Sequence, residues 1–477
     1  MAKFAILYRV HQWDVIAEAN YRQLVAQTRE ADIWVVANET DGPIPAAPRQ
    51  RHFRITEDDA AALGLPEYPK GRVFWFNNDF GLYLFALAKP EYDYYVLVEH
   101  DVYVHFDVDA LLQRVASTSV DLLAMPNRVH GRRWDHLDTC TEVWPEQQVE
   151  PNLLMFAAFS KRAVDLLLPK RLALAERYLR NDLKRWPIAE GFVATALREA
   201  GYGIADVSDY LDTSRYDWWP PVHFNEARSS VPGRIFHPVL AGIAYLDSAL
   251  RYRDVEPADW FDPDSPLRRQ LDHEPLELVA PVLANAFLER EEFGALFGLV
   301  SELDAPLRER IAPQMRAGID RLVAGKEDHD LAAHAVAFQS SVSQWSQGES
   351  READAGRPLA GEPNGSYSMH TDIELRPWWM VDLGTYCVVR RIAVFNRLDA
   401  EAARLRHLSI WSSLDARNWT RSSTWSLAVA PGGLVGLPFE VRFDGGLPCR
   451  YVRLELDGRD CLHFDKVQVG GVAAPWS

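Results

Sequence analysis

Three kinds of hydrophobic pattern follow one another along the chain, and the first is a set of short apolar runs. Phe4–Val10 and Ile33–Ala37 are rich in β-formers, and they flank the apolar-periodic stretch Val15–Arg29. Tyr94–Val98 is a further continuous apolar run, followed by acidic residues and then by the helix-like stretch Val108–Val115. Short apolar runs that alternate with helical periodicity are typical of βαβ units. We therefore expect an α/β domain in the N-terminal half.

The pattern changes twice in the rest of the chain. From Pro275 to Phe338 apolar residues recur with helical spacing, and clusters of β-branched residues are rare. Beyond this stretch, glycine, proline and serine separate short aromatic or β-branched runs, which predicts the antiparallel strands of a sandwich. These runs are WWMVDL, VVRRIAVF, HLSIWSS and YVRLEL. The sequence thus predicts a multidomain chain with an α/β domain over residues 1–250, a helical connector over 251–330 and an all-β sandwich over 331–477.

Composition indicates an ordinary globular protein. The 477 residues are 48% hydrophobic and 25% charged, which is enough for two or three globular cores. The formal net charge of -17 repels polyphosphate backbones, so we expect no nucleic-acid partner. The apolar stretches are too short to cross a bilayer, and the first residues do not have the pattern of a secretion signal. We expect a cytoplasmic protein without a transmembrane segment.

The cysteines fit that expectation. The chain has four of them, Cys140, Cys387, Cys449 and Cys461. They are sparse, and they lack the CxxC or Cys/His spacing that metal sites commonly have. We therefore expect reduced thiols without a structural metal.

An acidic pair follows the third predicted strand. The segment YYVLVEHDVYV carries Glu99 at the end of its apolar run and Asp101 two residues later. In α/β folds ligands bind at strand ends, and two carboxylates there can hold a divalent cation that neutralises a nucleotide diphosphate. The pair resembles the DxD motif of GT-A glycosyltransferases, with Glu99 in place of the first aspartate. That resemblance implies a nucleotide-sugar donor, Mn²⁺ or Mg²⁺ as cofactor, and Asp101 as a metal ligand of the catalytic site. The alternative is an acidic turn that binds no metal.

The same resemblance points to two later residues. Glu190 stands at the head of an apolar-periodic helix, where inverting GT-A enzymes carry the carboxylate that takes the proton of the acceptor hydroxyl. The alternative for Glu190 is an acid that complements the helix dipole. His237, in the segment Ile235-Phe-His-Pro, resembles the late histidine that adds a metal ligand in this family, and His223 is its rival. A structural histidine is the alternative for both.

Other polar and aromatic residues have two interpretations each. The segment Asn77–Asp79 is a candidate for loop donors near the nucleotide. Trp218 and Trp219 are candidates for stacking on a sugar face, and burial in the core is the alternative for such large rings. Trp378 and Trp379, by contrast, are expected in the core, as inward residues of a sandwich strand.

A histidine and two arginines stand at fixed offsets in the C-terminal part. His370 is followed after 26 residues by Arg397, then by Asp399, and after four more residues by Arg404. This spacing resembles the H-x26-R-x-D-x4-R/K pattern of F-type lectins, and residues 331–471 resemble the F5/8-type, discoidin-like sandwich. The resemblance implies a fucose pocket in which one imidazole and two guanidinium groups donate hydrogen bonds and Asp399 orients the arginines. The alternative is a cluster of surface salt bridges.

The C-terminal part also departs from the lectin pattern. Ala400 and Glu401 stand where many F-type lectins have adjacent cysteines that form a platform for the fucose methyl group, so the apolar side of the pocket is left open. The calcium loop of the family is poorly matched, with Asp354 and Asp465 as the candidate oxygen ligands. Binding of structural Ca²⁺ in the lectin domain is therefore an open alternative that we do not expect.

Together these motifs predict a glycosyltransferase that moves a sugar from a nucleotide-sugar donor onto a glycan. The lectin domain would hold fucose on the acceptor or the product, and the combination suggests polysaccharide assembly in a bacterium. One alternative is a fucose-binding adaptor whose α/β domain is catalytically inactive. Another is that the transferred sugar is itself fucose, which the lectin site then retains.

Overall fold

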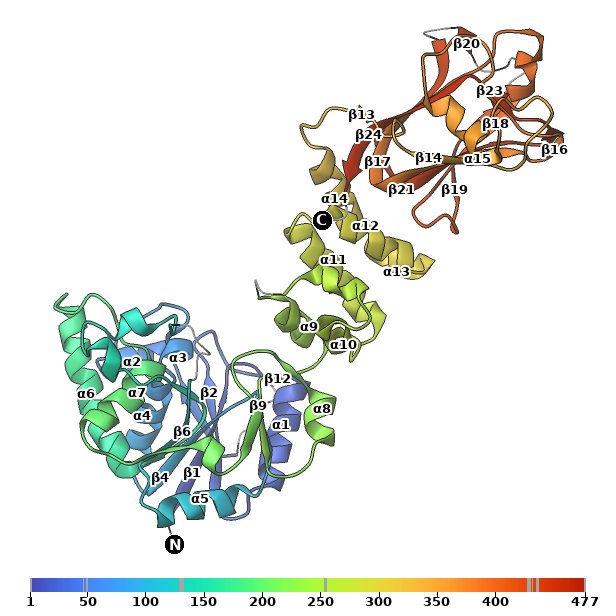
Figure 1. The fold of residues 1–477 in the computed structure, drawn as a ribbon. Helices are drawn as coiled ribbons and strands as arrows, with labels where there is room; N and C mark the ends of the chain where they lie inside the picture. Colours follow the sequence, from blue (N-terminus) through green and yellow to red (C-terminus); the bar gives the residue numbers. More distant parts are fainter. Residues whose placement is uncertain are drawn as a thin grey trace. The chain divides into compact units, whose positions relative to one another are not determined.

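The chain forms two compact units, Met1–Ala249 and Leu250–Ser477 (Figure 1). The structure is a computed structural model, and it describes residues 2–45, 47–48, 50–127, 133–252, 255–426, 430, 432–434 and 437–475. The two units are described separately below. The multidomain organisation expected from the sequence is confirmed.

A seven-stranded mixed sheet forms the centre of the N-terminal unit. Its strand order is β3-β2-β1-β4-β7-β6-β8. The first four strands in this order run parallel, whereas β7 runs antiparallel to its neighbours β4 and β6. The strands are β1 Phe4–Val10, β2 Asp32–Asn38, β3 His52–Ile55, β4 Tyr94–Glu99, β6 Leu122–Pro126, β7 Asn152–Ser160 and β8 Ile204–Asp206.

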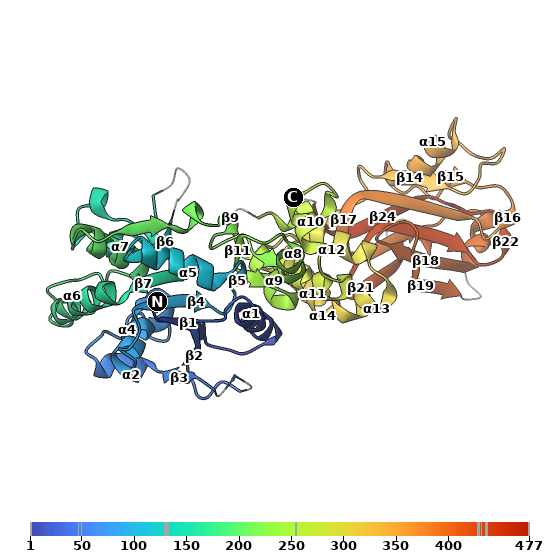
Figure 2. The same ribbon diagram turned by 90° about the horizontal axis from the view of Figure 1, so that it is seen from below.

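Helices cover both faces of this sheet (Figure 2). Successive side chains of a strand point to opposite faces, and β1 shows this directly. Ala5 and Leu7 pack in a core with α4, α6 and α7, whereas Ile6 and Tyr8 pack in a second core with α1 and α5. The helices are α1 Val15–Ala26, α2 Glu57–Ala62, α3 Val73–Phe76, α4 Asn78–Ala88, α5 Val108–Ser117, α6 Lys161–Leu179 and α7 Ala189–Glu199. The predicted α/β fold of this part is confirmed.

A second, smaller sheet completes the N-terminal unit and reaches the end of β4. Its order is β5-β11-β9, and β5 follows the acidic pair directly. Pairing of β11 with β5 therefore carries the end of β11 back toward residues 99–101. The remaining elements are β5 Tyr103–His105, β9 Asp212–Tyr216, β10 Val222–His223, α8 Phe224–Ser229, β11 Arg234–His237, β12 Val239–Leu240 and α9 Gly242–Leu250.

Helices open the C-terminal unit. They are η4 Pro257–Phe261, α10 Pro266–Leu271, α11 Leu276–Glu289, α12 Phe293–Glu302, α13 Ala305–Arg310 and α14 Ala312–Val323. The helical stretch predicted to run to Phe338 is wrong beyond Val323, because β13 (His329–Asp330) and β14 (Val336–Gln339) join the sandwich. In β14 exposed and buried side chains alternate, which is the period of a strand.

An all-β sandwich forms the rest of this unit, as predicted. Its main sheet has the order β13-β24-β17-β21-β18-β19, with β14 paired to β17 and β20 to β21. The register of β17 against β21 shifts between Asp382 and Cys387 and again between Val389 and Arg391, so one long strand contributes to different parts of the sandwich. The strands are β17 Trp378–Phe395, β18 His407–Ser413, β19 Thr420–Ser426, β20 Gly433–Leu434, β21 Leu437–Leu456 and β24 Lys466–Ala474.

Short elements lie at one end of the sandwich and carry the candidate sugar-binding residues. Two-stranded pairs form between β15 and β23 and between β16 and β22. These elements, together with two helical segments, are α15 Arg351–Gly356, η5 Arg357–Leu359, β15 Met369–His370, β16 Glu374–Leu375, η6 Ala400–Arg406, β22 Arg459–Asp460 and β23 His463–Phe464.

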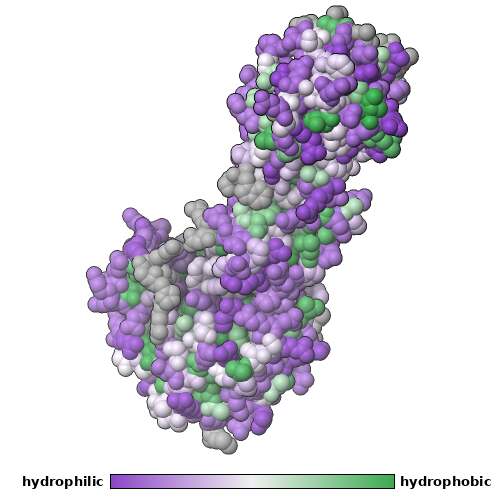
Figure 3. All heavy atoms as spheres, turned by 45° about the vertical axis from the view of Figure 1, so that its right-hand side comes forward, coloured by the Kyte–Doolittle hydropathy of each residue, from purple (hydrophilic) through white to green (hydrophobic). Residues whose placement is uncertain are grey.

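The surface is mixed in polarity. On the face drawn in Figure 3, hydrophobic side chains lie in small patches among hydrophilic ones. Of the helices that the structure describes, none combines the length and apolarity that a bilayer crossing requires.

Candidate functional sites

The acidic pair lies at the carboxyl end of a central strand. Glu99 is the last residue of β4, and the N–H of Val102 donates to the carbonyl oxygen of Glu99 at 3.0 Å, so Asp101 lies in a tight turn. In the sheet β4 adjoins β1, and β2 lies on the other side of β1. The helices that follow β1 and precede β4, α1 and α4, cover opposite faces of the sheet. This is a topological switch point, the place where open α/β sheets bind ligands.

His237 joins the two acids from the small sheet. It ends β11, and its Nε2 lies 3.5 Å from Oδ1 of Asp101 and 4.0 Å from Oε2 of Glu99. The ligand atoms of all three side chains lie within 4.8 Å of one another. The structure therefore brings together the three residues that the sequence proposed as one site. The rival His223 caps α8, where its Nδ1 accepts the N–H of Asn225.

The charges in this cluster stabilise each other. Nδ1 of His237 lies 2.6 Å from the carbonyl oxygen of Asp217, so Nδ1 carries a proton and Nε2 faces the carboxylates. Burial lowers the pKa of His237, but the charges of Asp101 and Glu99 and the hydrogen bonds outweigh it and raise the pKa to about 9. Burial raises the pKa of Asp101, but the charges of His237 and His100 outweigh that effect and hold the pKa well below its ordinary value.

The donor set fits a divalent cation. Oδ1 of Asp101 is buried, and among the described residues its charged partner is Nε2 of His237 at the long distance of 3.5 Å, so this oxygen is open to a cation. Glu99 adds a second carboxylate, which Arg9 holds through an Nη1–Oε1 contact of 3.0 Å. Carboxylate oxygens are hard ligands that suit Mg²⁺ or Mn²⁺, and the imidazole of His237 suits Mn²⁺. Bound metal would replace the proton on Nε2 of His237.

Glu190 lies near this cluster, in the first turn of α7. Burial, reinforced by the negative charge of Glu99, raises the pKa of the Glu190 carboxyl to about 7. The start of α7 is closely packed, because a Cβ on Gly191 would lie 2.5 Å from the sulfur of Cys140. A buried carboxyl that titrates near neutral pH has the pKa that a general base needs.

The loop before α7 is held by a buried ion pair. Arg171 and Asp79 are both fully buried, with Nε of Arg171 2.7 Å from Oδ2 of Asp79. Nη1 of Arg171 also donates to the carbonyl oxygen of Pro187 at 2.5 Å. The prediction that Asn77–Asp79 supplies loop donors near a nucleotide is therefore wrong for Asn77 and Asp79, because Asp79 accepts from Arg171 and Tyr83 and Asn77 binds Trp186. For Asn78 it stays a prediction.

The two tryptophan pairs differ in how deeply their rings are buried. Trp218 is 52% exposed, whereas Trp219 is half-buried and donates from Nε1 to the carbonyl oxygen of Ser248. Trp379 lies in the sandwich core as predicted. The same prediction is wrong for Trp378, which lines a pocket of 440 Å³ together with Trp411, Trp419, Arg376, Arg453, Glu455, Glu374, Leu375 and Ser340.

The residues of the predicted sugar site lie on the short elements at one end of the sandwich. His370 ends β15, Arg397 follows β17 by two residues and Arg404 lies in η6. The three side chains come from separate elements but share neighbours. The guanidinium of Arg397 and the ring of His370 both lie against Tyr367, at 4.4 Å and 5.5 Å. Nη1 of Arg404 lies 3.0 Å from the sulfur of Cys461, which neighbours His370. Burial, together with the positive charges of both arginines, lowers the pKa of His370. His370 is therefore neutral at neutral pH.

The tautomer of His370 changes its expected role. Its Nδ1 lies 2.7 Å from the carbonyl oxygen of Thr371, so Nδ1 carries the proton and donates it there. Nε2 of the neutral ring is then an acceptor. The expectation of three convergent donors is therefore corrected for His370, whose Nε2 is a hydrogen-bond acceptor, whereas the two guanidinium groups are donors.

The arginines are oriented by different acids. Asp399 pairs with Arg397 through both of its oxygens. Arg404 instead pairs with Glu401 at 2.8 Å and approaches Asp460 at 3.4 Å. The prediction that Asp399 orients both arginines therefore holds for Arg397 alone.

Comparison with known families agrees with this geometry. Residues 361–454 match a family model of the F5/8 type C group that is described as "NedA-like, galactose-binding domain". The C-terminal unit contains an F5/8 type C domain. It is a discoidin-like domain of the carbohydrate-binding, lectin-like kind. No curated protein matches the chain significantly.

Several solved structures resemble the F5/8 type C domain. One is the serum fucolectin of striped bass, Morone saxatilis, with 25% identity, a TM-score of 0.27 and coverage of 31% of this chain and half of that one. Another is a fucose binding module of Streptococcus pneumoniae, with 25% identity, a TM-score of 0.25 and coverage of 30% and 94%. A third is the lectin domain of lectinolysin in complex with Lewis B antigen, with 27% identity, a TM-score of 0.25 and coverage of 30% and 97%.

The two candidate calcium ligands of the F5/8 type C domain accept hydrogen bonds from N–H groups, and calcium binding there stays open. Asp354 is fully buried, and its Oδ1 accepts the backbone N–H groups of Gln347 and Gly348. Its Oδ2 accepts the N–H of His370 and the side-chain amide of Gln339. Oδ2 of Asp465 likewise accepts two backbone N–H groups, those of residues 364 and 365. Both carboxylates hold loops in place, and their engaged oxygens face N–H donors.

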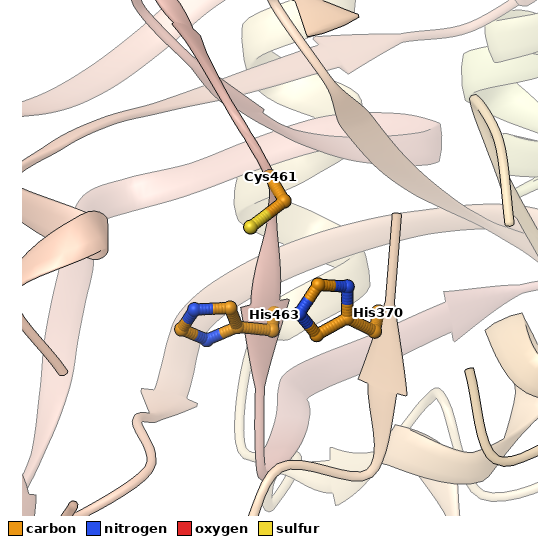
Figure 4. A group of neighbouring side chains, drawn as sticks. All are labelled: His370, Cys461 and His463. Carbon is orange, nitrogen blue, oxygen red and sulfur yellow. The ribbon is translucent and has the colours of Figure 1, made fainter. Parts of the chain in front are cut away.

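The sequence did not reveal two further residues beside His370. Cys461 and His463 lie next to it, and the three ligand atoms are within 4.8 Å of one another (Figure 4). Burial and the charge of Arg397 are the largest causes that lower the pKa of His463 to about 3. The segment Cys461-Leu-His463 is a Cys/His pair separated by one residue, and extended chain places such a pair on one face. This spacing is not one that metal sites commonly have, so the sequence carried no signal for the cluster.

Proposed function

We propose that the chain is a metal-dependent glycosyltransferase whose F5/8 type C domain binds fucose on the acceptor or product glycan. The observation that supports the enzymatic part is the cluster of Glu99, Asp101 and His237 at the switch point of the sheet. Glu190, with its pKa near neutrality, lies beside the cluster. Acidic ligands and a tuned carboxyl in one place suit transfer from a nucleotide diphosphate to a hydroxyl.

In this proposal each residue has a separate task. Glu99, Asp101 and His237 would hold a Mn²⁺ or Mg²⁺ ion, which would supply positive charge to neutralise the diphosphate of the nucleotide-sugar. Arg9 fixes Glu99 in its orientation. Glu190 accepts the proton of the acceptor hydroxyl as that oxygen attacks the anomeric carbon of the donor sugar, and the bond from this carbon to the diphosphate breaks, which releases the nucleoside diphosphate. The exposed ring of Trp218 offers an apolar face for a sugar.

The F5/8 type C domain binds fucose through a small polar set. Arg397 and Arg404 donate hydrogen bonds to the sugar oxygens, and Nε2 of His370 accepts a hydrogen bond from one hydroxyl group. All three side chains are oriented before a sugar binds. Asp399 orients Arg397, and Glu401 orients Arg404. The carbonyl oxygen of Thr371 orients the ring of His370. A neutral sugar offers hydroxyl and ring oxygens, which match guanidinium donors.

The metal site is tested by Asp101→Asn, which keeps the shape of the side chain and removes its charge. We expect wild-type protein to gain thermal stability from a nucleoside diphosphate in the presence of Mn²⁺, because a ligand that binds the folded state stabilises it. The variant should lose that gain, since Asp101 supplies the central carboxylate. A thermal-shift panel of nucleoside diphosphates with and without Mn²⁺ measures this.

The exposed Asp182 provides the control, and Asp182→Asn should behave as wild type. Equal Mn²⁺-dependent stabilisation of wild type and Asp101→Asn would remove the metal assignment. Hydrolysis of nucleotide-sugars by the wild-type protein then separates an enzyme from an adaptor lectin, which would bind fucose without turnover.

The sugar pocket is tested by Arg404→Ala. A hydrogen bond from a charged donor contributes about 1.5–3 kcal/mol, so its loss should weaken fucose binding roughly ten- to hundredfold. Titration calorimetry of the full chain with fucose measures the affinity. Hydrolysis of the donor should persist, because Arg404 belongs to the other compact unit.

Arg406 is the matched control for Arg404. It lies in the same segment, η6, and its side chain is exposed. Arg406→Ala should bind fucose as wild type does. Undiminished fucose binding by Arg404→Ala, or a preference of the wild type for sugars without the stereochemistry of fucose, would refute the pocket assignment.

A further inference from the structure

A second cluster of potential metal ligands lies inside the F5/8 type C domain. The ligand atoms of His370, Cys461 and His463 lie within 4.8 Å of one another, and all three residues are buried. Ligands of a tetrahedral zinc ion at bond lengths of about 2.0–2.3 Å are roughly 3.3–3.8 Å apart. An inward movement of about 1 Å or less therefore completes such a geometry. Only a small movement of the three side chains separates their ligand atoms from the spacing of a zinc site.

His463 has no other partner for its polar atoms. The residue is fully buried, and within the described protein neither ring nitrogen makes a hydrogen bond. An imidazole buried in this way normally finds a partner, because a buried polar atom without a hydrogen bond destabilises the folded state. The ring packs beside that of His370, with centroids 5.2 Å apart (Figure 4). A metal ion bound to a nitrogen of His463 would satisfy it.

His370 already has the form that metal ligands take. Its Nδ1 donates to the carbonyl oxygen of Thr371, which fixes the tautomer and leaves the lone pair on Nε2. Metal-binding histidines usually have such a backbone acceptor on the other nitrogen. The register of β15 and β23 pairs His370 directly with His463, so the two rings come from neighbouring positions of one ladder.

Cys461 supplies a sulfur as the third ligand. Burial raises the pKa of its thiol by more than the nearby charge of Arg404, whose Nη1 lies 3.0 Å from the sulfur, lowers it, so a bound ion has to displace the thiol proton. The two guanidinium groups of the pocket do not leave a large excess of positive charge, because Asp399 pairs with Arg397 while Glu401 and Asp460 neighbour Arg404. Two imidazoles and one thiolate are ligands that zinc prefers over hard cations such as Ca²⁺.

We propose that His370, Cys461 and His463 form a site for a borderline d-block cation of the Zn²⁺ type beside the two arginines of the proposed sugar site, Arg397 and Arg404. Binding releases the thiol proton of Cys461 to solvent and leaves a fourth position on the ion for water. Because Nε2 of His370 then belongs to the ion, it no longer accepts a sugar hydroxyl. Metal and fucose therefore compete. The metal site itself does not depend on the proposed sugar function, and only the competition does.

Co²⁺ is the probe, because it replaces zinc and absorbs light. Reduced full-length protein titrated with Co²⁺ should develop the thiolate-to-cobalt charge-transfer band and the visible bands of tetrahedral coordination. The cluster of Glu99, Asp101 and His237 contains no sulfur and cannot produce the first band. Cys461→Ser should lose the charge-transfer band. His463→Phe, which keeps an aromatic ring, should weaken Co²⁺ binding at least about tenfold.

Cys387→Ala is the control, because Cys387 is buried in the same sandwich but outside the cluster, and this variant should keep the band. Saturating Zn²⁺ should weaken fucose binding at least about tenfold, and a chelator should restore it. Absence of the charge-transfer band in wild type, or its survival in Cys461→Ser, overturns the metal site. Fucose binding that is unchanged by bound Zn²⁺ overturns the competition. If the charge-transfer band appears but the metal-free protein does not bind fucose, the metal site is supported and only the sugar proposal is refuted.

Discussion

The Glu190→Gln variant should bind the nucleotide-sugar donor normally and transfer the sugar about a hundredfold or more slowly. Glutamine keeps the size and polarity of the side chain but cannot accept the proton of the acceptor hydroxyl. The loss should therefore appear in turnover rather than in donor affinity. Steady-state transfer rates, together with donor binding measured by calorimetry, separate the two effects.

The pH profile gives this prediction a second readout. Burial and the charge of Glu99 raise the pKa of Glu190 to about 7, so the carboxylate form is gained as the pH rises through about 7. A base acts only when deprotonated, so the wild-type transfer rate should increase over this interval. Glu190→Gln should not show that increase.

Glu199 at the other end of α7 is the matched control. Its side chain is 51% exposed and pairs with Lys170 on the surface, so Glu199→Gln should leave turnover and its pH dependence unchanged. Wild-type turnover in Glu190→Gln would exclude Glu190 as the base. The helix-dipole interpretation of Glu190 would then stand.

The largest loss of stability is expected for Arg171→Met. Arg171 and Asp79 are fully buried, and removing one member of a buried ion pair costs about 3–5 kcal/mol because the other charge stays unpaired. The guanidinium also lies 4.0 Å from the centroid of Phe192 and binds the carbonyl oxygen of Pro187. Denaturant unfolding followed by a probe in the N-terminal unit measures the change in the free energy of unfolding.

Lys170, the preceding residue of α6, offers a control of the same charge. It pairs with Glu199 at 2.7 Å on the surface, where such pairs contribute about 0–1 kcal/mol. Lys170→Met should therefore change stability little. A loss below about 1 kcal/mol in Arg171→Met would show that the buried pair is dispensable. Replacing Asp79 together with Arg171 by leucine should recover part of the loss, since no charge then remains buried.

Elements whose signal lies within one segment were predictable. The continuous apolar run of β1 and the apolar period of Val15–Arg29 indicate a buried strand and a helix, so the type and position of both elements follow directly. The ends were less certain, because α1 stops at Ala26. The stretch up to Phe338 was misread as helical, since the short β14 gains its stability from pairing with β17.

The candidate sites were predictable to the extent that motif spacing describes them. Fixed offsets from His370 identified both arginines of the sugar pocket, and the acids at the end of β4 marked the other site. The spacing did not say which acid orients which arginine. It also did not reveal the tautomer of His370, because a carbonyl oxygen of the main chain sets it.

By itself the sequence determined the α/β and all-β character of the two parts, the acidic strand end and the histidine–arginine spacing, because each is written in neighbouring or regularly spaced residues. Only the tertiary structure decided that His237 meets Asp101 across 136 positions and that His463 lies beside His370. The pKa of Glu190 and the pairing of Arg171 with Asp79 also depend on it. The physical reason is common to all four. Burial and the approach of distant charges arise only when separate elements pack, and local periodicity carries no information about their distances.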